Sequence, residues 1–358
     1  MIGIICFWDR IATPYLEKYE NFLIENNIEY RVILWNRDPN KTMNLKKNDI
    51  VINLNNSKSF IKKLILFFVW KKKITKVLTH HKFDKLIVLS TMPGFLLNRL
   101  IIKKFRNKYL FDIRDYTFEK NYLFRSVIGK LIDNSFFTTI SSKGFLTWLP
   151  ESSKIVVNHN ITVNNVSEVT EPNFNGSKIE FAFVGNVRLD KQTKSVLVNL
   201  NQSKKYISSF YGRVIPTSDT AKFIKDKNIK NVFLHGEFTN DQKGKIYSSV
   251  GLINAVYANS NNPKNYGDST PLPNRVYDCA IFKRPIVCSK NTYLEKIVNE
   301  YNLGFAINGF DDDVESQFDN YINTFDKELF VKGCNSFLLM ALEEEQVFTN
   351  KLEIFLKG

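Results

Sequence analysis

Residues 269–289 carry hydroxyl, amide and carboxylate side chains at the start of a predicted helix that leads into a short strand. The first N–H groups of a helix have no partner within it, so they can bind an anion. Ser269, Thr270 and Asn274 add further donors at this end of the helix. The sequence therefore predicts an anion site here, of a kind that suits a phosphate.

Asp278 lies one turn into the same helix and can face the same loop. A carboxylate in this position can accept hydrogen bonds from two ribose hydroxyls, which would complete a nucleotide site. The alternative is that Asp278 only complements the positive end of the helix dipole. The residues alone leave both interpretations open.

A second candidate anion site lies where a predicted strand ends at Gly185. Arg188 and Lys191 follow in the next turn, and exposed backbone beside two cations suits a diphosphate. Two later predicted strands also end in glycine, and we expect these ends at the same edge of a sheet. They are Tyr206–Tyr211 before Gly212, and the strand from Val232 to Leu234 before His235 and Gly236.

The first half of the chain holds a third candidate. The predicted strand Tyr109–Ile113 runs directly into Arg114 and Asp115. Ligands bind at the carboxyl ends of the strands in open α/β sheets, so this pair is a candidate site. A structural ion pair is the alternative.

Strands and helices alternate along the chain, which is typical of α/β folds with parallel sheets covered by helices. With 358 residues the chain exceeds the size at which a single core keeps growing, so we expect two domains. Asparagine, proline and glycine interrupt the pattern at residues 161–178, which predicts a linker between domains 1–160 and 179–334. Residues 311–313 are three aspartates that we interpret as a helix start rather than a metal site.

The net charge of +14 is concentrated in the first half. Residues 58–108 contain 14 Lys or Arg and one acidic residue, whereas residues 301–358 contain 4 basic and 11 acidic residues. No zinc-finger, helix-turn-helix or RNP-type motif accompanies the basic region, so we do not expect a nucleic-acid partner.

The predicted helix from Ser57 to Thr79 combines an apolar centre with flanking lysines. Its apolar run is too short to span a bilayer, but Phe67, Phe68 and Trp70 beside seven lysines suit an anionic membrane surface. A core helix with solvated lysines is the alternative. The chain start reads as a strand rather than a leader, so we expect a cytoplasmic protein at the inner face of the membrane.

The four cysteines lack metal-ligand spacing and are expected to be buried thiols.

The order and spacing of these motifs resemble those of family 4-type retaining glycosyltransferases of the GT-B fold. In the second half the similarity rests on residues 181–185 with Lys191, 235–237 through Tyr247, and 272–278 with 284–286. The first half is similar to the bacterial polysaccharide branch of the family. That similarity rests on residues 112–115, 139–142, 149–150 and 159–160.

The resemblance implies two Rossmann-like domains whose parallel sheets face each other across a cleft, with the last helix, residues 335–358, crossing back to the first. It implies hexosyl transfer from a nucleotide diphosphate sugar to a lipid-linked saccharide acceptor in capsule, O-antigen or exopolysaccharide synthesis. No metal or cofactor would be required. The catalytic residues that it implies are Arg188, Lys191, Arg114 and Asp115. The donor-binding residues that it implies are Gly185, Asn186, Gly212, His235, Gly236, Ser269, Thr270, Asn274, Arg275 and Asp278.

Three positions depart from the family pattern, and two other classes of protein fit the same features. The family's two glutamates, eight positions apart, fall on Thr270 and Asp278. Its arginine after the loop glycine falls on Asn186, so Arg188 would take over that charge. The other classes are a sugar-nucleotide epimerase or hydrolase of the same fold, and a non-catalytic basic module that binds lipid or nucleic acid.

Overall fold

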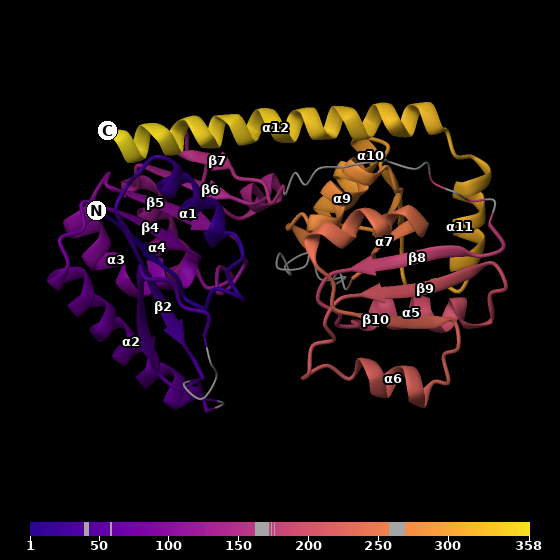
Figure 1. The fold of residues 1–358 in the computed structure, drawn as a ribbon, viewed down its shortest axis with the longest axis horizontal. Coiled ribbons are helices and arrows are strands. Elements are labelled where there is room, and N and C mark those ends of the chain that lie inside the picture. Colours follow the sequence, from indigo (N-terminus) through magenta and orange to yellow (C-terminus); the bar gives the residue numbers. More distant parts are fainter. Residues whose placement is uncertain (39–42, 58, 162–171, 173, 175, 258–268) are drawn as a thin grey trace. The chain divides into compact units, whose positions relative to one another are not determined.

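The computed structural model describes residues 1–38, 43–57, 59–161, 172, 174, 176–257 and 269–358. The chain divides into two compact units. Unit 1 comprises Met1–Asn160 with Glu344–Gly358, and unit 2 comprises Ile161–Glu343. Each unit is built around one sheet with covering helices (Figure 1). Most of the predicted linker, residues 161–178, lies outside the described residues.

Unit 1 contains a seven-stranded parallel sheet in the order β3-β2-β1-β4-β5-β6-β7. Its strands are β1 (Ile2–Ile5), β2 (Tyr30–Asn36), β3 (Asp49–Asn53), β4 (Lys85–Leu89), β5 (Tyr109–Ile113), β6 (Phe137–Ile140) and β7 (Ile155–Val157). Its helices are α1 (Leu16–Glu25), α2 (Phe60–His80), α3 (Thr91–Phe105), α4 (Tyr122–Asn134), the 3-10 helix Lys143–Thr147 and the end of α12 (Lys327–Lys357).

The central strands of unit 1 are apolar along their length because helices cover both faces of the sheet. Ile4 pairs in register with Val32 and Ile87, and all three belong to the core under α1 and the end of α12. Helices α2, α3 and α4 lie side by side and cover the other face (Figure 1). Helix α4 was not predicted; Asn121 caps it by accepting the N–H of Phe124 at 3.2 Å.

Unit 2 contains a six-stranded parallel sheet in the order β10-β9-β8-β11-β12-β13. Its strands are β8 (Ile179–Val184), β9 (Tyr206–Tyr211), β10 (Val232–Gly236), β11 (Val250–Ala255), β12 (Ile286–Ser289) and β13 (Gly304–Ile307). Its helices are α5 (Lys191–Asn199), α6 (Thr220–Asp226), α7 (Lys243–Ser249), α9 (Asn274–Phe282), α10 (Tyr293–Glu300), α11 (Val314–Asn323), the start of α12, and the 3-10 helices Leu200–Gln202 and Asn240–Gln242. The predicted α/β class with two parallel sheets is confirmed. Residues 311–313 directly precede α11, as predicted.

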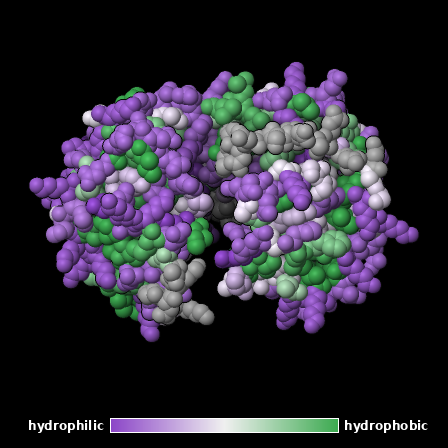
Figure 2. Space-filling model, viewed as in Figure 1, coloured by the Kyte–Doolittle hydropathy of each residue, from purple (hydrophilic) through white to green (hydrophobic). Residues whose placement is uncertain are grey.

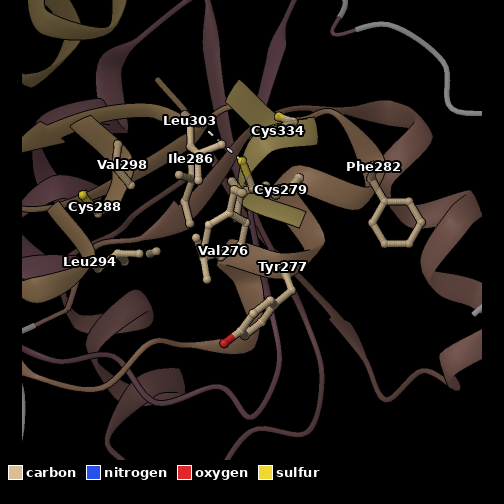
Figure 3. Packing of buried hydrophobic residues seen from close by; sticks show 14 of the residues in the cluster. Val276, Tyr277, Cys279, Phe282, Ile286, Cys288, Leu294, Val298, Leu303 and Cys334 are labelled. Atoms are coloured by element: carbon tan, nitrogen blue, oxygen red, sulfur yellow. Dashed lines mark hydrogen bonds between the residues drawn. The ribbon is translucent and has the colours of Figure 1, made fainter. Parts of the chain in front are cut away.

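Figure 3 shows the core of unit 2 around α9, where Val276 and Cys279 pack near Ile286 of β12 and Cys334 of α12. The Sγ of Cys279 donates to the carbonyl oxygen of Leu303 at 3.4 Å. All four cysteines of the chain are buried free thiols, as predicted. Burial raises the pKa of the Cys279 thiol well above its usual range, so it stays protonated.

Arg284 joins the ends of two helices. Its Nε donates to the carbonyl oxygen of Tyr247 at 2.7 Å, and its Nη1 donates to the carbonyl oxygens of Phe282 and Lys283 at 3.1 and 3.0 Å. The last carbonyls of a helix have no partner within it, so this side chain satisfies groups at the ends of α7 and α9. Burial lowers the pKa of Arg284 to about 10. Arg284 is therefore a structural residue that holds α9 in place.

Two of the three aromatic residues predicted to contact a membrane, Phe67 and Trp70, instead pack against aromatic side chains of unit 1. Trp70 is fully buried, and its ring centroid lies 5.3 Å from that of Phe7 and 5.9 Å from that of Trp35. Phe67 also contacts Phe7, at 5.8 Å between centroids. These two residues belong to the core because they point toward the aromatic side chains that follow β1 and end β2. Trp70 is therefore not available to a membrane, and Phe67 is half-buried.

The opposite face of α2 is apolar and exposed. Its residues, the α2 apolar face, are each more than half exposed: Phe60, Ile61, Leu64, Ile65 and Phe68. Figure 2 shows apolar atoms gathered over this part of unit 1, at the lower left of the view. The helix begins after Ser59 rather than at Ser57, and Lys58 lies outside the described residues. Among the described residues no helix is long and apolar enough to cross a membrane.

Helix α12 begins at Lys327 and not at the predicted Asn335. Asp326 accepts the N–H of Leu329 at 2.9 Å, which caps the added turns. The earlier start carries the helix through Gly333, where a Cβ would overlap the carbonyl oxygen of Tyr301. The glycine therefore permits a close approach between α12 and the end of α10.

We expect Gly333→Ala to lower the free energy of unfolding by about 1–3 kcal/mol, because the added methyl group must displace the backbone of Tyr301. The matched control is Gly244→Ala, at a helical position of the same unit where a Cβ meets nothing within 4 Å. That variant should be neutral or more stable by up to about 1 kcal/mol through helix propensity. Urea unfolding measures both, and equal stability of the two variants would contradict the close approach.

Candidate active site

Three strand ends of unit 2 meet at the carboxyl edge of its sheet. The N–H of Gly212 donates to the carbonyl oxygen of Gly236 at 2.6 Å, and a Cβ at Gly212 would overlap the carbonyl oxygen of Gly185. Gly185, Gly212 and Gly236 have φ values of 145°, 136° and 80°, which residues with side chains rarely adopt. The structure therefore brings these predicted residues together and leaves this edge free of their side chains.

Arg275, the second residue of α9, places its guanidinium beside Gly185. The Nη1 atom lies 3.6 Å from the position that a Cβ of Gly185 would take, and the guanidinium carbon lies 4.0 Å from the centroid of the Phe183 ring. The Nε atom is buried and makes no hydrogen bond, and no described carboxylate forms an ion pair with this side chain. Burial lowers the pKa of Arg275. A cation that pairs with no described carboxylate thus lies beside bare backbone, which is an arrangement suited to an anion.

Arg188 and Lys191 lie in the turn after β8 and line a pocket of about 650 Å³ together with Tyr257. Both are exposed, and Lys191 is the first residue of α5. Asp190 caps this helix by accepting the N–H of Thr193 at 2.9 Å. Asn186 is exposed in the same turn. The structure therefore presents the two predicted cations to solvent and to a ligand.

Asp278 is 6% exposed and holds two partners from α7. Its Oδ1 lies 2.9 Å from the Nζ of Lys243, and its Oδ2 accepts the hydroxyl of Tyr247 at 2.9 Å. The carboxylate therefore does more than complement the helix dipole, because it joins α9 to α7. Two oxygens offer about four acceptor positions, so the carboxylate has room for further donors. Lys243 was not predicted as a site residue, although it lies within residues 235–247, on which part of the family resemblance rests.

His235 and the loop before α9 complete the predicted donor-binding set. The His235 ring stacks on Tyr211 at 4.2 Å between centroids and 6° between planes, and its Nε2 lies 3.3 Å from the Oγ of Ser209. Asn274 is exposed and begins α9, whose cap residue Pro273 provides no side-chain hydrogen bond. Thr270 is 4% exposed, whereas Ser269 is half-buried. Asn274 therefore lies where an incoming group can reach it, and Thr270 does not.

In unit 1 the structure pairs Arg114 with Asp112 and not with the predicted partner, Asp115. The Nε of Arg114 donates to Asp112 at 2.8 Å, and its Nη1 donates to the carbonyl oxygen of Asn158 and the side chain of Asn160 at 3.1 and 2.6 Å. Tyr19 also donates to Asp112, at 2.6 Å. This pattern favours the structural interpretation of Arg114.

Asp115 follows this buried pair and is exposed. Partial desolvation of its carboxylate raises its pKa, and the charge of Asp112 acts in the same direction, whereas Arg114 opposes both. Since the guanidinium of Arg114 is occupied by Asp112, Asp115 is the freer member of the predicted pair.

The chain matches no protein-family model and no curated protein sequence. Solved structures resemble it along nearly its full length. Sucrose-phosphate synthase from Thermosynechococcus elongatus has a TM-score of 0.69 at 12% identity and is covered over 98% of each chain. The lipopolysaccharide outer core galactosyltransferase WaaB has a TM-score of 0.65 at 13% identity over 98% of each chain. Anabaena HepE in complex with UDP and glucose has a TM-score of 0.61 at 12% identity, over 98% of this chain and 99% of the other. At such identities the likeness establishes the fold, so this chain has the GT-B fold with two Rossmann-like units.

Proposed function

We propose that the protein is a glycosyltransferase that moves a sugar from a nucleotide diphosphate sugar to a saccharide acceptor. The observation that carries the proposal is Arg275, whose guanidinium has no counter-ion among the described residues and lies beside Gly185. Arg188 and Lys191 follow the same strand end. A diphosphate supplies the negative charge that these groups lack. The same fold occurs in structures that contain UDP and UDP-glucose, which supports this class of ligand.

The chemistry follows from where charge develops. When the bond between the sugar and the diphosphate breaks, the electron pair stays on the diphosphate. The acceptor oxygen forms the new bond to the sugar, and its proton passes to an oxygen of the departing diphosphate. Cations and backbone donors fixed around the leaving diphosphate stabilise the transition state more than the ground state. In this proposal Arg188, Lys191 and Arg275 supply that stabilisation without a metal ion.

The nucleoside end of the donor is assigned to Asp278 and the α7 region. The Asp278 carboxylate would accept the ribose hydroxyls while Lys243 and Tyr247 hold it in position. The stacked ring of His235 offers an exposed aromatic surface near the same edge. We propose UDP as the nucleotide because three structures of the neighbour HepE contain UDP or UDP-glucose.

The finer parts of the proposal concern the acceptor and its place in the cell. The motif resemblance supports transfer of a hexose with retention at the anomeric carbon, in the synthesis of a bacterial surface polysaccharide. The α2 apolar face and its lysines support contact with an anionic membrane, where a lipid-linked acceptor would lie. Release of free sugar without an acceptor would instead favour a hydrolase of the same fold.

We expect Arg275→Gln to weaken binding of UDP by about ten- to a hundredfold, because a hydrogen bond from a charged group contributes roughly 1.5–3 kcal/mol. Calorimetry with UDP and with inorganic pyrophosphate measures the effect. Both ligands should lose affinity, since the lost group meets the phosphates.

Two further variants make this experiment specific. Lys230→Gln removes an exposed cation from unit 2 outside the candidate site and should leave both affinities unchanged. Asp278→Asn should weaken the binding of UDP and leave the binding of pyrophosphate unchanged, because only UDP carries ribose hydroxyls. A folded Arg275→Gln protein with normal UDP affinity would refute the role of this arginine.

We expect Lys191→Ala to lower kcat by about a hundredfold with a smaller change in donor binding, because leaving-group charge is largest in the transition state. Turnover of candidate UDP-sugars with a saccharide acceptor, followed with and without EDTA, is the measurement. Activity should persist in EDTA. Loss of all activity in EDTA, or normal turnover of Lys191→Ala, would contradict the metal-free cationic site.

We expect the protein to sediment with anionic vesicles at low salt and to remain in the supernatant with neutral vesicles. At about 1 kcal/mol per lysine, three lysines near the surface give roughly a hundredfold preference, which salt should reduce. Leu64→Gln with Phe68→Gln should weaken sedimentation, as should glutamate at Lys71, Lys72 and Lys73. Ile24→Gln, at an exposed apolar position on α1, is the matched control. Unchanged sedimentation of both sets of variants would show that α2 does not contact the membrane.

A further inference from the structure

A pocket of about 480 Å³ lies in unit 1, at the carboxyl edge of its sheet. Trp8 follows β1, Asn36 ends β2 and Asn56 follows β3, and these three strands are neighbours in the sheet. The pocket therefore occupies the edge where ligands bind in open parallel sheets. None of the motifs of the proposed nucleotide site contributes to it.

Arg37, directly after β2, is held in this pocket by aromatic rings. Its guanidinium carbon lies 3.3 Å from the centroid of the Trp8 ring, 4.1 Å from that of Trp35 and 4.6 Å from that of Phe7. Such contacts hold a cation through the electron-rich faces of the rings and leave its charge uncompensated. An arginine in this position presents an intact positive charge to a ligand.

The hydrogen bonds of Arg37 are incomplete. Its Nη2 donates to the carbonyl oxygen of Phe7 at 3.0 Å, whereas its Nε is buried without a partner. No described carboxylate forms an ion pair with it, and Nη1 makes no hydrogen bond in the described part of the chain. Burial lowers the pKa of Arg37 to about 10, and the charge of Asp9 opposes this shift. The nearby Arg10 differs, because Glu20 and Asp49 neutralise it. Among the described residues that line this pocket, Arg37 is thus the cation that pairs with no carboxylate.

The remaining lining suits the hydroxyls and the apolar face of a sugar ring. Trp8 is 42% exposed, and the open part of its ring can pack on the C–H groups of a pyranose. Asn44 and Asn56 offer amide groups, and Asp9 and Asp38 offer carboxylates that accept from hydroxyls. A ligand with both hydroxyls and a negative charge would contact these polar side chains and Arg37 together.

We propose that this pocket binds an acidic saccharide, with the sugar ring on Trp8 and its carboxylate or phosphate on the free edge of Arg37. This inference rests on the proposed function in one respect: it makes the acceptor of that transfer a sugar that carries an anionic group. The binding itself is a property of unit 1 alone.

The test is ligand-observed NMR titration of the full chain with glucuronate, glucose 6-phosphate, glucose and glucosamine. We expect at least one of the two acidic sugars to bind about tenfold or more tightly than glucose, because a charged hydrogen bond is stronger than a neutral one. Comparison of glucuronate with glucose 6-phosphate distinguishes a carboxylate from a phosphate. Equal binding of acidic and neutral sugars, or a preference for glucosamine, would overturn the proposal.

Single substitutions identify the residue that binds the anionic group of the sugar. Arg37→Gln should reduce the affinity for the acidic sugar to that for glucose. The matched control Arg31→Gln removes a cation from β2, the strand that Arg37 follows, outside the pocket and should change nothing. Trp8→Ala, at an exposed position, should weaken the binding of all four sugars. It therefore tests the site even if Arg37→Gln does not fold. Unchanged binding in Arg37→Gln or in Trp8→Ala would refute the site.

UDP binding, measured on the same samples, separates this inference from the proposed function. Acidic-sugar binding without UDP binding would support the unit 1 site and refute the proposed transfer. UDP binding without any preference for acidic sugars would refute only the site at Arg37.

Discussion

The close contact between the backbones of Gly185 and Gly212 decides where the candidate active site lies. A side chain at Gly212 would overlap the backbone of Gly185 at the end of the neighbouring strand. With glycine at both positions, the carboxyl edge of β8 and β9 consists of bare backbone here. In a parallel sheet all strands end at one edge, and the groups that follow them are brought together without any contact in sequence. Arg275 and Asp278 reach the same region from α9, because that helix packs against β11 and β12.

Four arginines, two buried and two half-buried, differ in what satisfies them, and this difference separates structural from functional candidates. Arg114 pairs with Asp112, and Arg284 donates to the carbonyl oxygens at the ends of two helices. Arg275 and Arg37 form no ion pair with a described carboxylate; both contact aromatic rings, and each keeps a buried Nε without a partner. Burying an unpaired charge is costly, so a cation left in this state is explained best by a ligand that completes it. In the described part of each unit, one arginine of this kind lies near the carboxyl edge of the sheet.

Helix α2 shows how one element serves the core and the surface at once. Trp70 and Phe67 fill the space between the helix and the aromatic residues after β1, whereas Phe60 and Phe68 remain exposed. A helix that only covered a sheet would place polar residues on its outer face. The exposed aromatic residues among lysines are therefore the feature of unit 1 that the core does not explain.

The alternation of strands and helices was enough to predict two parallel sheets, because local patterns determine them. The glycine after β8 was likewise enough to predict a strand that ends in exposed backbone at Gly185. The sequence did not reveal that Arg114 pairs with Asp112, since both candidate carboxylates are close in the chain and only packing chooses between them. It also did not show which face of α2 is buried, because that helix is apolar all round at its centre. That neither Arg275 nor Arg37 forms an ion pair with a described carboxylate was likewise decided by the tertiary structure. Whether a charge has a partner depends on residues far apart in sequence, and only the folded chain brings them together or keeps them apart.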